Sequence, residues 1–264
     1  MNKSIQYQKY LKKQKINKLL VILTQLAIVI FLIGLWQFLA NKEIINVFIY
    51  SSPQKVVETI ISLHMDNNLY NHIFITVYET IISFILGTLI GTIIAILLWW
   101  NNFLYKVMDP YLTILNSLPK VALGPIIIII VGANMNSIIV MALLISVIIT
   151  ILNVYNGFSN TDQNKINLLK SFQATKFQIL KMVILPNSYP TIISSLKINV
   201  SMSLIGVIMG EFLVSKEGLG YLIMYGSQVF NLNLVISGII ILMIVSYLMY
   251  LFVNYIEKLL IKNK

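Results

Sequence analysis

The sequence predicts an all-α, polytopic membrane protein with about six transmembrane helices. Of its 264 residues, 58% are hydrophobic and 11% are charged, a combination typical of integral membrane proteins. Apolar runs recur along the chain and are long enough to cross a hydrocarbon core of about 30 Å. The lysines concentrate in alternate segments between those runs. Together these three observations favour a bundle of membrane-spanning helices.

Six segments are predicted to span the membrane. They cover residues 19–40, 77–100, 110–131, 137–155, 191–214 and 234–253. The first has no small residues suited to a signal-peptidase cut after Ala40, so we expect it to be retained as a helix. The third contains Pro119, Gly124 and Pro125, which break or kink helices. It is expected to be either two half-helices or one tilted, interrupted helix.

A short amphipathic helix is predicted between the first two spans, on the outer face. Ser52 suits the N-cap position, and Pro53 suits the first helical position. The apolar residues that follow at helical spacing are Val56, Val57, Ile60 and Ile61.

The lysines predict the orientation of the chain. There are 19 basic residues and nine acidic ones, which gives a net charge of +10, and every basic residue is a lysine. With the amino terminus inside, fourteen lysines fall in inner segments, three in outer segments, and Lys120 and Lys197 within spans. Because positive residues concentrate on the cytoplasmic side, we expect both termini in the cytoplasm and no role in nucleic-acid binding. Residues 1–18 then form a cytoplasmic basic tail, and residues 19–260 form one transmembrane domain.

The longest inner loop, residues 156–190, is predicted to hold two short helices. Thr175 and Gln178 fit a capping box, and Pro186 is expected to end the helix that this box starts. A break is expected near residues 173–174. The upstream helix is predicted from Ile166, Leu169 and Phe172, and the apolar stripe of the downstream helix from Phe177, Leu180, Val183 and Ile184.

Two interpretations of this loop are open. It contains lysines but no acid over residues 168–190, so it suits a hairpin on lipid headgroups with its lysines toward anionic lipid. It equally suits a docking element for a soluble partner, with an aromatic tip at Phe172 and Phe177.

The loop resembles the cytoplasmic "EAA" loop of the inner-membrane permeases of binding-protein-dependent ABC importers. It departs from the family pattern at 167–169, which replace E-A-A, and at Gln173, which replaces a glycine. The matching residues before and around "ILP" at 184–186 are Ala174, Thr175, Phe177, Gln178, Ile179, Val183, Leu185, Pro186 and Pro190.

Two further blocks resemble other parts of these permeases. "DPYLTILNSLPKVALGPIIIIIVG" is similar to their third helix, and "GVIMGEFLVSKEGLGYLIMYG" to their fifth helix and the following outer loop. The resemblance spans most of residues 50–255. It is strongest to the nitrate, sulfonate and taurine group, which also includes uptake systems for vitamin-precursor pyrimidines.

The resemblance implies a type I ABC importer permease fold and a set of partners. It implies a homodimer in a bacterial cell membrane, cytosolic ABC ATPase subunits and an extracytoplasmic solute-binding protein. The chain lacks a P-loop, so ATP would be used by the partner subunit, and no cofactor or metal is expected on this chain. The implied solute is a sulfonate, nitrate or taurine-like anion, or a pyrimidine vitamin precursor. The residues implied to couple to the ATPase are Leu168, Leu169, Ser171, Phe172, Gln173, Ala174, Thr175, Phe177 and Gln178.

Small and polar residues recur on one face of the fifth span. This face suits close helix packing, because Gly206 and Gly210 form a G-x-x-x-G pair. It also suits the lining of a passage between two permease copies, where Asn199 and Ser203 would offer hydrogen bonds. Both interpretations are open. The candidate passage residues are Ser195, Asn199, Ser203, Gly206, Gly210 and Glu211.

Three charged or small-residue features of the spans have specific expectations. Glu211, near the outer end of the fifth span, suits an outer gate or binding-protein docking, with interfacial solvation as the competing role. Lys197 is expected to snorkel to the inner headgroups rather than to bind solute. In the second span, helix packing is predicted for Ser83, Gly87, Gly91 and Ala95.

Two other functional classes fit the sequence less well. An integral membrane enzyme acting on lipid needs clustered acids, histidines or a nucleophile with its base, and the only histidines are His64 and His72 in the outer segment. An ion-driven secondary transporter favours inverted repeats and several intramembrane acids. Without cysteine the chain has no thiolate nucleophile and no disulfide. We therefore expect a transporter component that is not an enzyme.

Overall fold

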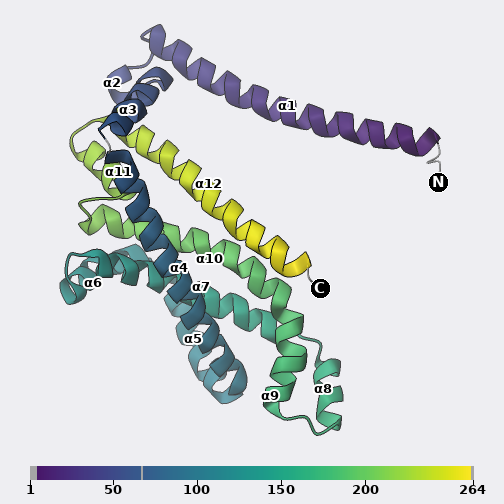
Figure 1. Cartoon of the computed structure of the whole chain (residues 1–264). Coiled ribbons are helices and arrows are strands. Elements are labelled where there is room, and N and C mark those ends of the chain that lie inside the picture. Colours follow the sequence, from purple (N-terminus) through teal and green to yellow (C-terminus); the bar gives the residue numbers. More distant parts are fainter. Residues whose placement is uncertain (1–4, 67, 263–264) are drawn as a thin grey trace.

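The fold is a bundle of long helices joined by short ones (Figure 1). The structure, a computed structural model, describes residues 5–66 and 68–262. Over these residues the regular elements are all helical, which confirms the predicted all-α class. Five helical segments are long and apolar enough to cross a membrane, or six if one bent pair counts as a span. The long helices are α1 (Ile5–Asn41), α4 (Asn68–Trp100), α7 (Met135–Ser159), α10 (Leu185–Val214) and α12 (Leu232–Lys262).

Short helices lie at opposite ends of the bundle (Figure 1). One end holds α2 (Val47–Tyr50), α3 (Pro53–Met65) and α11 (Leu219–Gln228), and the other end holds α8 (Gln163–Ser171) and α9 (Lys176–Ile179). The predicted amphipathic helix is α3. The side chain of Ser52 caps it by accepting a hydrogen bond from the Lys55 N–H at 3.3 Å, and Pro53 occupies its first turn.

Several long helices extend beyond the predicted spans. α4 begins at Asn68 rather than at residue 77, and α12 continues to Lys262 rather than stopping at 253. Hydropathy marks the apolar part of a helix, whereas the backbone hydrogen bonds continue into its polar ends. The basic residues that precede the first span are likewise helical from Ile5 onward in α1, while Lys3 and Lys264 lie outside the described residues.

The third predicted span is two half-helices. The segment Asn102–Ser117, which is α5, and the segment Lys120–Val131 meet at an angle of 90°. Leu118 has the extended backbone, with ψ 137°, that a residue before proline favours, and Pro119 follows it. A 3₁₀ turn, η1 (Lys120–Leu123), then leads into α6 (Gly124–Val131), where Pro125 fits the first turn.

Glycines bring α4, α7 and α10 into close contact. A Cβ atom added to Gly91 would lie 2.6 Å from the Thr150 Cβ, and one added to Gly210 would lie 2.8 Å from the Ile138 Cγ2. Such distances leave no room for a side chain, so the helices approach along their backbones, as small residues allow in membranes. The four glycines at these contacts are Gly87 and Gly91 on α4 and Gly206 and Gly210 on α10.

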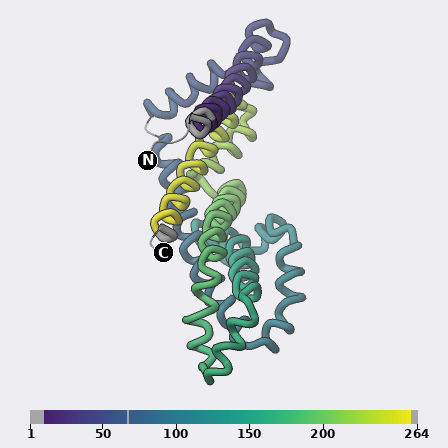
Figure 2. Tube along the Cα trace, turned by 90° about the vertical axis from the view of Figure 1, so that its right-hand side faces the viewer, coloured from purple at the N-terminus to yellow at the C-terminus, as the bar shows by residue number. Residues whose placement is uncertain are grey.

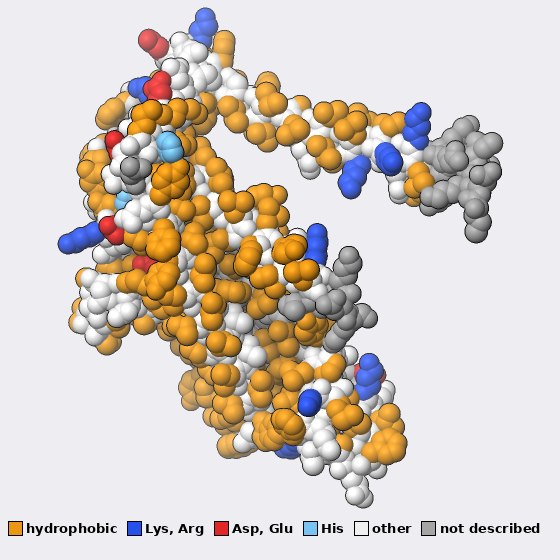
Figure 3. All heavy atoms as spheres, in the orientation of Figure 1, with side chains coloured by type: hydrophobic (Ala, Val, Ile, Leu, Met, Phe, Trp, Pro, Cys, Tyr) orange, Lys and Arg blue, Asp and Glu red, His pale blue; other side chains and the backbone are white. Residues whose placement is uncertain are grey.

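Most of helix α1 lies away from the bundle in Figure 1 and is seen nearly end-on in Figure 2. Near its end it meets α3, where the Gln54 N–H donates to Gln37 Oε1 at 3.1 Å. Within its most apolar stretch no residue is buried. Hydrophobic side chains cover its visible surface and most of the visible body, while lysines mark its free end (Figure 3). Such a surface is suited to a hydrocarbon environment rather than to water.

The α7–α10 contact should be sensitive to a single methyl group. We expect Gly206→Ala to lower the free energy of unfolding by about 1–3 kcal/mol, because its Cβ would collide with the backbone of Ala142. The measurement is the thermal melting temperature of the purified protein in detergent. Gly34→Ala in α1 is the matched control, since nothing lies within 4 Å of its added Cβ. Equal melting temperatures for the two variants would contradict the contact.

Candidate functional sites

The α8–α9 elbow, residues 163–179, turns sharply at one residue. The Asp162 carboxylate caps α8 by accepting a hydrogen bond from the Asn164 N–H at 2.9 Å. Gln173 then adopts the left-handed conformation, with φ 58°, and its N–H donates to the Lys170 carbonyl at 2.9 Å. The predicted break near residues 173–174 is confirmed. Gln173, which replaces the glycine of the resembling pattern, thus makes the same kind of turn at a steric cost.

The capping box at the start of α9 is confirmed. The Thr175 hydroxyl accepts from the Gln178 N–H at 3.3 Å, and the Gln178 side-chain oxygen accepts from the Thr175 N–H at 2.7 Å. This helix begins where the sequence predicted.

The prediction that Pro186 ends this helix is wrong. A π-helical turn, η2 (Leu180–Ile184), joins α9 directly to α10. In this turn the Leu185 N–H donates to the Leu180 carbonyl, and the wider backbone accommodates the proline ring that follows. The run Lys176–Val214 therefore has 39 residues and a length of about 58 Å. The elbow is therefore continuous with a spanning helix, with no loop between them.

The elbow has one buried face and one exposed face. Ile179, Leu180 and Ile184 are buried together with residues of α4 and α7. Phe172 and Phe177 are 74% and 61% exposed. Of the predicted apolar stripe, Leu180 and Ile184 are buried, whereas Phe177, like Phe172, is exposed. Of the nine predicted coupling residues, Leu169 and Ala174 are half-buried, and those exposed are Leu168, Ser171, Phe172, Gln173, Thr175, Phe177 and Gln178.

The six candidate passage residues lie on the face of α10 that packs inside the chain, and all are buried. The contacts of Gly206 and Gly210 with α7 are those expected of helix packing. The Asn199 side-chain amide donates to the Thr88 hydroxyl at 2.6 Å. The Asn199 Oδ1 and Ser203 Oγ atoms are buried and make no hydrogen bond with the described protein atoms. Contact of these residues with a solute stays a prediction.

Lys197 has an ionic partner that the sequence did not identify. Its amine forms an ion pair with the Glu257 carboxylate of α12 and lies 5.9 Å from the ring centroid of Tyr250. The two charged side chains are 24% and 16% exposed. Because the lysine is neutralised, it offers no unpaired charge to an anionic solute.

At the other end of α10, Glu211 fastens the turn that leads into α11. The Thr76 hydroxyl of α4 donates to Glu211 Oε1 at 2.6 Å, and the Gly220 N–H donates to Oε2 at 2.5 Å. The Thr76 hydroxyl also accepts from the Leu219 N–H at 2.8 Å. Glu211 is 1% exposed, so interfacial solvation does not account for its position.

Glycine is required where the 215–221 turn meets this carboxyl group. Gly218 has φ 105°, and a Cβ there would collide with the Glu211 carboxyl group. The Gly218 N–H donates to His72 Nδ1 at 2.9 Å. The turn is thus held by α4 and α10 together.

Glu79 on α4 is a site residue that sequence reasoning missed. Its side chain is 2% exposed and is hydrogen-bonded to that of Glu211. It lies four residues before Ser83, at the start of the face that was read only as packing. An acid within a membrane span is costly and is a functional candidate by default, so the sequence alone could have identified Glu79.

Most of the chain matches one protein family. Residues 87–262 match the model for binding-protein-dependent transport system inner membrane components. A probable ABC transporter permease protein of Haemophilus influenzae is 32% identical over 235 residues, which cover 89% of this chain and 95% of that protein. The chain belongs to this family.

Two further comparisons agree with this membership. A putative aliphatic sulfonates transport permease protein of Bacillus subtilis is 27% identical over 231 residues, covering 88% of the permease and 84% of that protein. The inward-facing MetNI methionine ABC transporter has a chain that aligns with a TM-score of 0.65 at 22% identity, covering 74% of the permease and 96% of that chain. The predicted importer permease fold is confirmed. As a transport permease, the protein is neither a lipid-acting enzyme nor an ion-driven secondary transporter.

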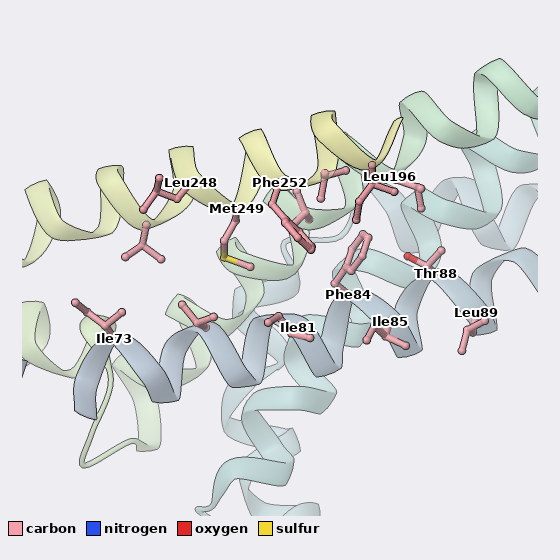
Figure 4. Close-up of a pocket in the computed structure, with 15 residues that line it drawn as sticks. Ile73, Ile81, Phe84, Ile85, Thr88, Leu89, Leu196, Leu248, Met249 and Phe252 are labelled. Atoms are coloured by element: carbon pink, nitrogen blue, oxygen red, sulfur yellow. The ribbon is translucent and has the colours of Figure 1, made fainter. Parts of the chain in front are cut away.

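The permease has an apolar cavity of about 760 Å³ between α4, α10 and α12 (Figure 4). Thr88 is the single polar residue among the 15 that line it, and its hydroxyl already accepts from Asn199. Binding of a polar solute needs several convergent polar groups. This cavity is therefore suited to apolar chains and not to a polar solute. Among the described residues, no three His, Asp or Glu side chains are arranged to hold a metal.

The turn at Gln173 should tolerate glycine better than a helical position does. We expect Gln173→Gly to stabilise the elbow of the permease by about 1 kcal/mol, because glycine adopts positive φ without steric cost. Gln163→Gly, in α8, should destabilise it by up to about 1 kcal/mol. Hydrogen–deuterium exchange of the 163–179 peptides should slow in the first variant and accelerate in the second. Faster exchange in both would contradict the left-handed turn.

Proposed function

We propose that the permease works as a homodimer with two cytosolic ATPase subunits and an extracytoplasmic solute-binding protein in a bacterial cell membrane. Both termini lie in the cytoplasm, and residues 156–190 form the coupling loop. The observation that carries this proposal is the α8–α9 elbow, which exposes Phe172 and Phe177 on one face and is buried against α4 and α7 on the other. Exposed aromatic side chains on a supported surface are typical of a docking site.

Helix continuity explains how the elbow would transmit movement. Closure of the ATPase subunits on ATP pushes the two elbows together, and the 39-residue run from Lys176 carries the displacement into the membrane. The helix hydrogen-bond pattern is altered at η2 and at Pro190, which has no N–H to donate. Bending would concentrate at these positions, and the rest of α10 would move as a rod.

Helix α10 forms one wall of the proposed passage. Its buried set, from Ser195 to Glu211, packs against α4 and α7. An exposed or half-buried stripe lies on the other side. Next to this stripe, a groove of about 580 Å³ between α10 and α12 includes hydroxyl-bearing residues, which suit a polar solute better than the apolar cavity does. The stripe consists of Ser194, Ile198, Ser201 and Ile205, and the hydroxyl-bearing residues are Ser201, Ser246, Tyr247 and Tyr250.

The solute is proposed to be a small polar anion of the sulfonate class. Support comes from the relative in Bacillus subtilis whose name specifies aliphatic sulfonates. Nitrate and a pyrimidine vitamin precursor are the competing solutes, while taurine falls within the sulfonate class. The test is the ATPase rate of the reconstituted complex with binding protein loaded with each solute in turn. A sulfonate should stimulate the rate, and stimulation by the pyrimidine alone would overturn the assignment.

The two proposed partners would bind at opposite ends of the bundle. The elbow lies at the end opposite to α2 and α3 (Figure 2). With the elbow in the cytoplasm, the exposed face of α3 and the 215–221 turn face the binding protein. Membrane lipid covers the apolar surface between the two ends.

Charged residues at the elbow tip should prevent assembly with the ATPase. Phe172→Glu with Phe177→Glu should reduce copurifying ATPase by at least about tenfold, because desolvating an unpaired charge in an apolar contact is costly. The amount of permease in the membrane should not change.

A matched control is available at the other end of the molecule. Phe230 is 73% exposed, close to the 74% of Phe172. Phe230→Glu should leave ATPase copurification intact. An undiminished amount of ATPase copurifying with the elbow variant would contradict the coupling role.

The proposed orientation can be tested with single cysteines, because the natural chain contains none. Ser171→Cys in the elbow and Glu58→Cys in α3 both place a thiol at an exposed position. A membrane-impermeant maleimide applied to intact cells should label position 58 and should reach position 171 only after the cells are opened. The reverse pattern would place the elbow outside and the termini with it.

A further inference from the structure

Two carboxyl groups meet in a buried site. Glu79 of α4 and Glu211 of α10 are 2% and 1% exposed, and their side chains are hydrogen-bonded to each other. An ionised carboxyl group only accepts hydrogen bonds, so a bond between two of them requires a proton on one. Two ionised carboxylates would also repel strongly in a buried site.

The hydrogen bonds assign the proton to one partner. Glu211 accepts from the Thr76 hydroxyl and from the N–H groups of Gly220 and Tyr221. Thr76 accepts from the Leu219 N–H, which leaves its own hydrogen free to point at Glu211. The second oxygen of Glu79, Oε2, has no partner among the described protein atoms. The donors therefore converge on Glu211, an arrangement that favours the negative charge on Glu211 and the proton on Glu79.

We propose that Glu79 is a positioning residue, a neutral carboxylic acid that donates its hydrogen to Glu211 and thereby fastens the 215–221 turn to α4 and α10. Without this donor Glu211 would lose one of its hydrogen bonds. With Glu79 ionised, Glu211 would face a second negative charge. In either case the Glu211 carboxylate is displaced, or its hydrogen bonds to the start of α11 are weakened.

The consequence for transport rests on the proposed function. In the proposed orientation this turn lies at the end that faces the binding protein. The proton on Glu79 would then hold the docking ends of α10 and α11 in one arrangement. The assignment of the proton to Glu79 depends only on the hydrogen bonds and not on the proposed function.

Other titratable groups surround the pair. His72 of α4 accepts from the Gly218 N–H and stacks on Tyr221 of α11, with 5.9 Å between ring centroids. Glu217 and Lys216 lie exposed in the turn itself, and α7 carries no acid, lysine or histidine. Protonation of His72 at Nδ1 would remove its acceptor on acidification. Ionisation of Glu79 would loosen the turn at alkaline pH. The turn would therefore loosen at low pH through His72 and at high pH through Glu79.

Infrared spectroscopy tests the proton directly. The full chain, purified in an ester-free detergent at pH 7, should show the C=O stretching band of a protonated carboxylic acid. We expect Glu79→Gln to remove this band and Glu58→Gln, at an exposed position of α3, to leave it. The assignment is overturned if the wild type lacks the band or if the band survives in Glu79→Gln.

Labelling of the turn tests the positioning role. Leu219→Cys places a single thiol at a position of the turn that is 0% exposed in the parent, and Glu58→Cys in a separate protein gives a reference rate that corrects for the pH dependence of thiols. Relative to this reference, Glu79→Ala should raise labelling at position 219 by about tenfold, as expected for loss of a buried hydrogen bond. Glu79→Gln keeps a neutral donor, so its labelling should stay close to that of the parent near neutral pH and should lack the alkaline increase that the proposal predicts for the parent.

Equal labelling in the parent and Glu79→Ala would overturn the positioning role, as would Glu79→Gln behaving like Glu79→Ala. Neither the infrared band nor the labelling ratio uses ATPase, binding protein or solute. A failure of this inference is therefore distinct from a failure of the proposed transport function.

Discussion

Close backbone contact between α4, α7 and α10 is the constraint on which the rest of the structure depends. Lipid tails are as apolar as leucine, so helices in a membrane associate through fit and hydrogen bonding rather than through burial from water. Gly87, Gly91, Gly206 and Gly210 supply that fit, because a side chain at any of them would meet α7. The three helices consequently act as one unit, to which the functional ends are attached.

Helix α10 connects those two ends. On one side it continues through η2 and α9 into the exposed elbow, and on the other it presents Glu211 to the turn before α11. A helix held along its length by α4 and α7 transmits displacement rather than absorbing it. The elbow and the 215–221 turn are therefore mechanically linked, although their sequences are separated by a whole span.

Local signals in the sequence predicted local structure well. The capping box of Thr175 and Gln178, the cap at Ser52 and the break at Pro119 each depend on neighbours in the chain, and each is present. What failed depends on partners far away in sequence. The ion pair of Lys197 with Glu257 and the contact of Glu79 with Glu211 are set by how helices meet. The prediction that Pro186 ends the helix failed because a π turn accommodates the proline ring. No residue type in the sequence predicts such a turn.

The charged groups inside the helices are neutralised in two different ways. Lys197 is balanced by Glu257 across α10 and α12, and the negative charge of Glu211 is met by backbone and hydroxyl donors and by a neutral Glu79. The bundle of one chain thus presents little uncompensated charge to attract a polar solute. The cavity between α4, α10 and α12 is apolar as well. A polar solute must then cross along surfaces that the chain leaves exposed, which favours a passage assembled between two copies over one inside a single copy.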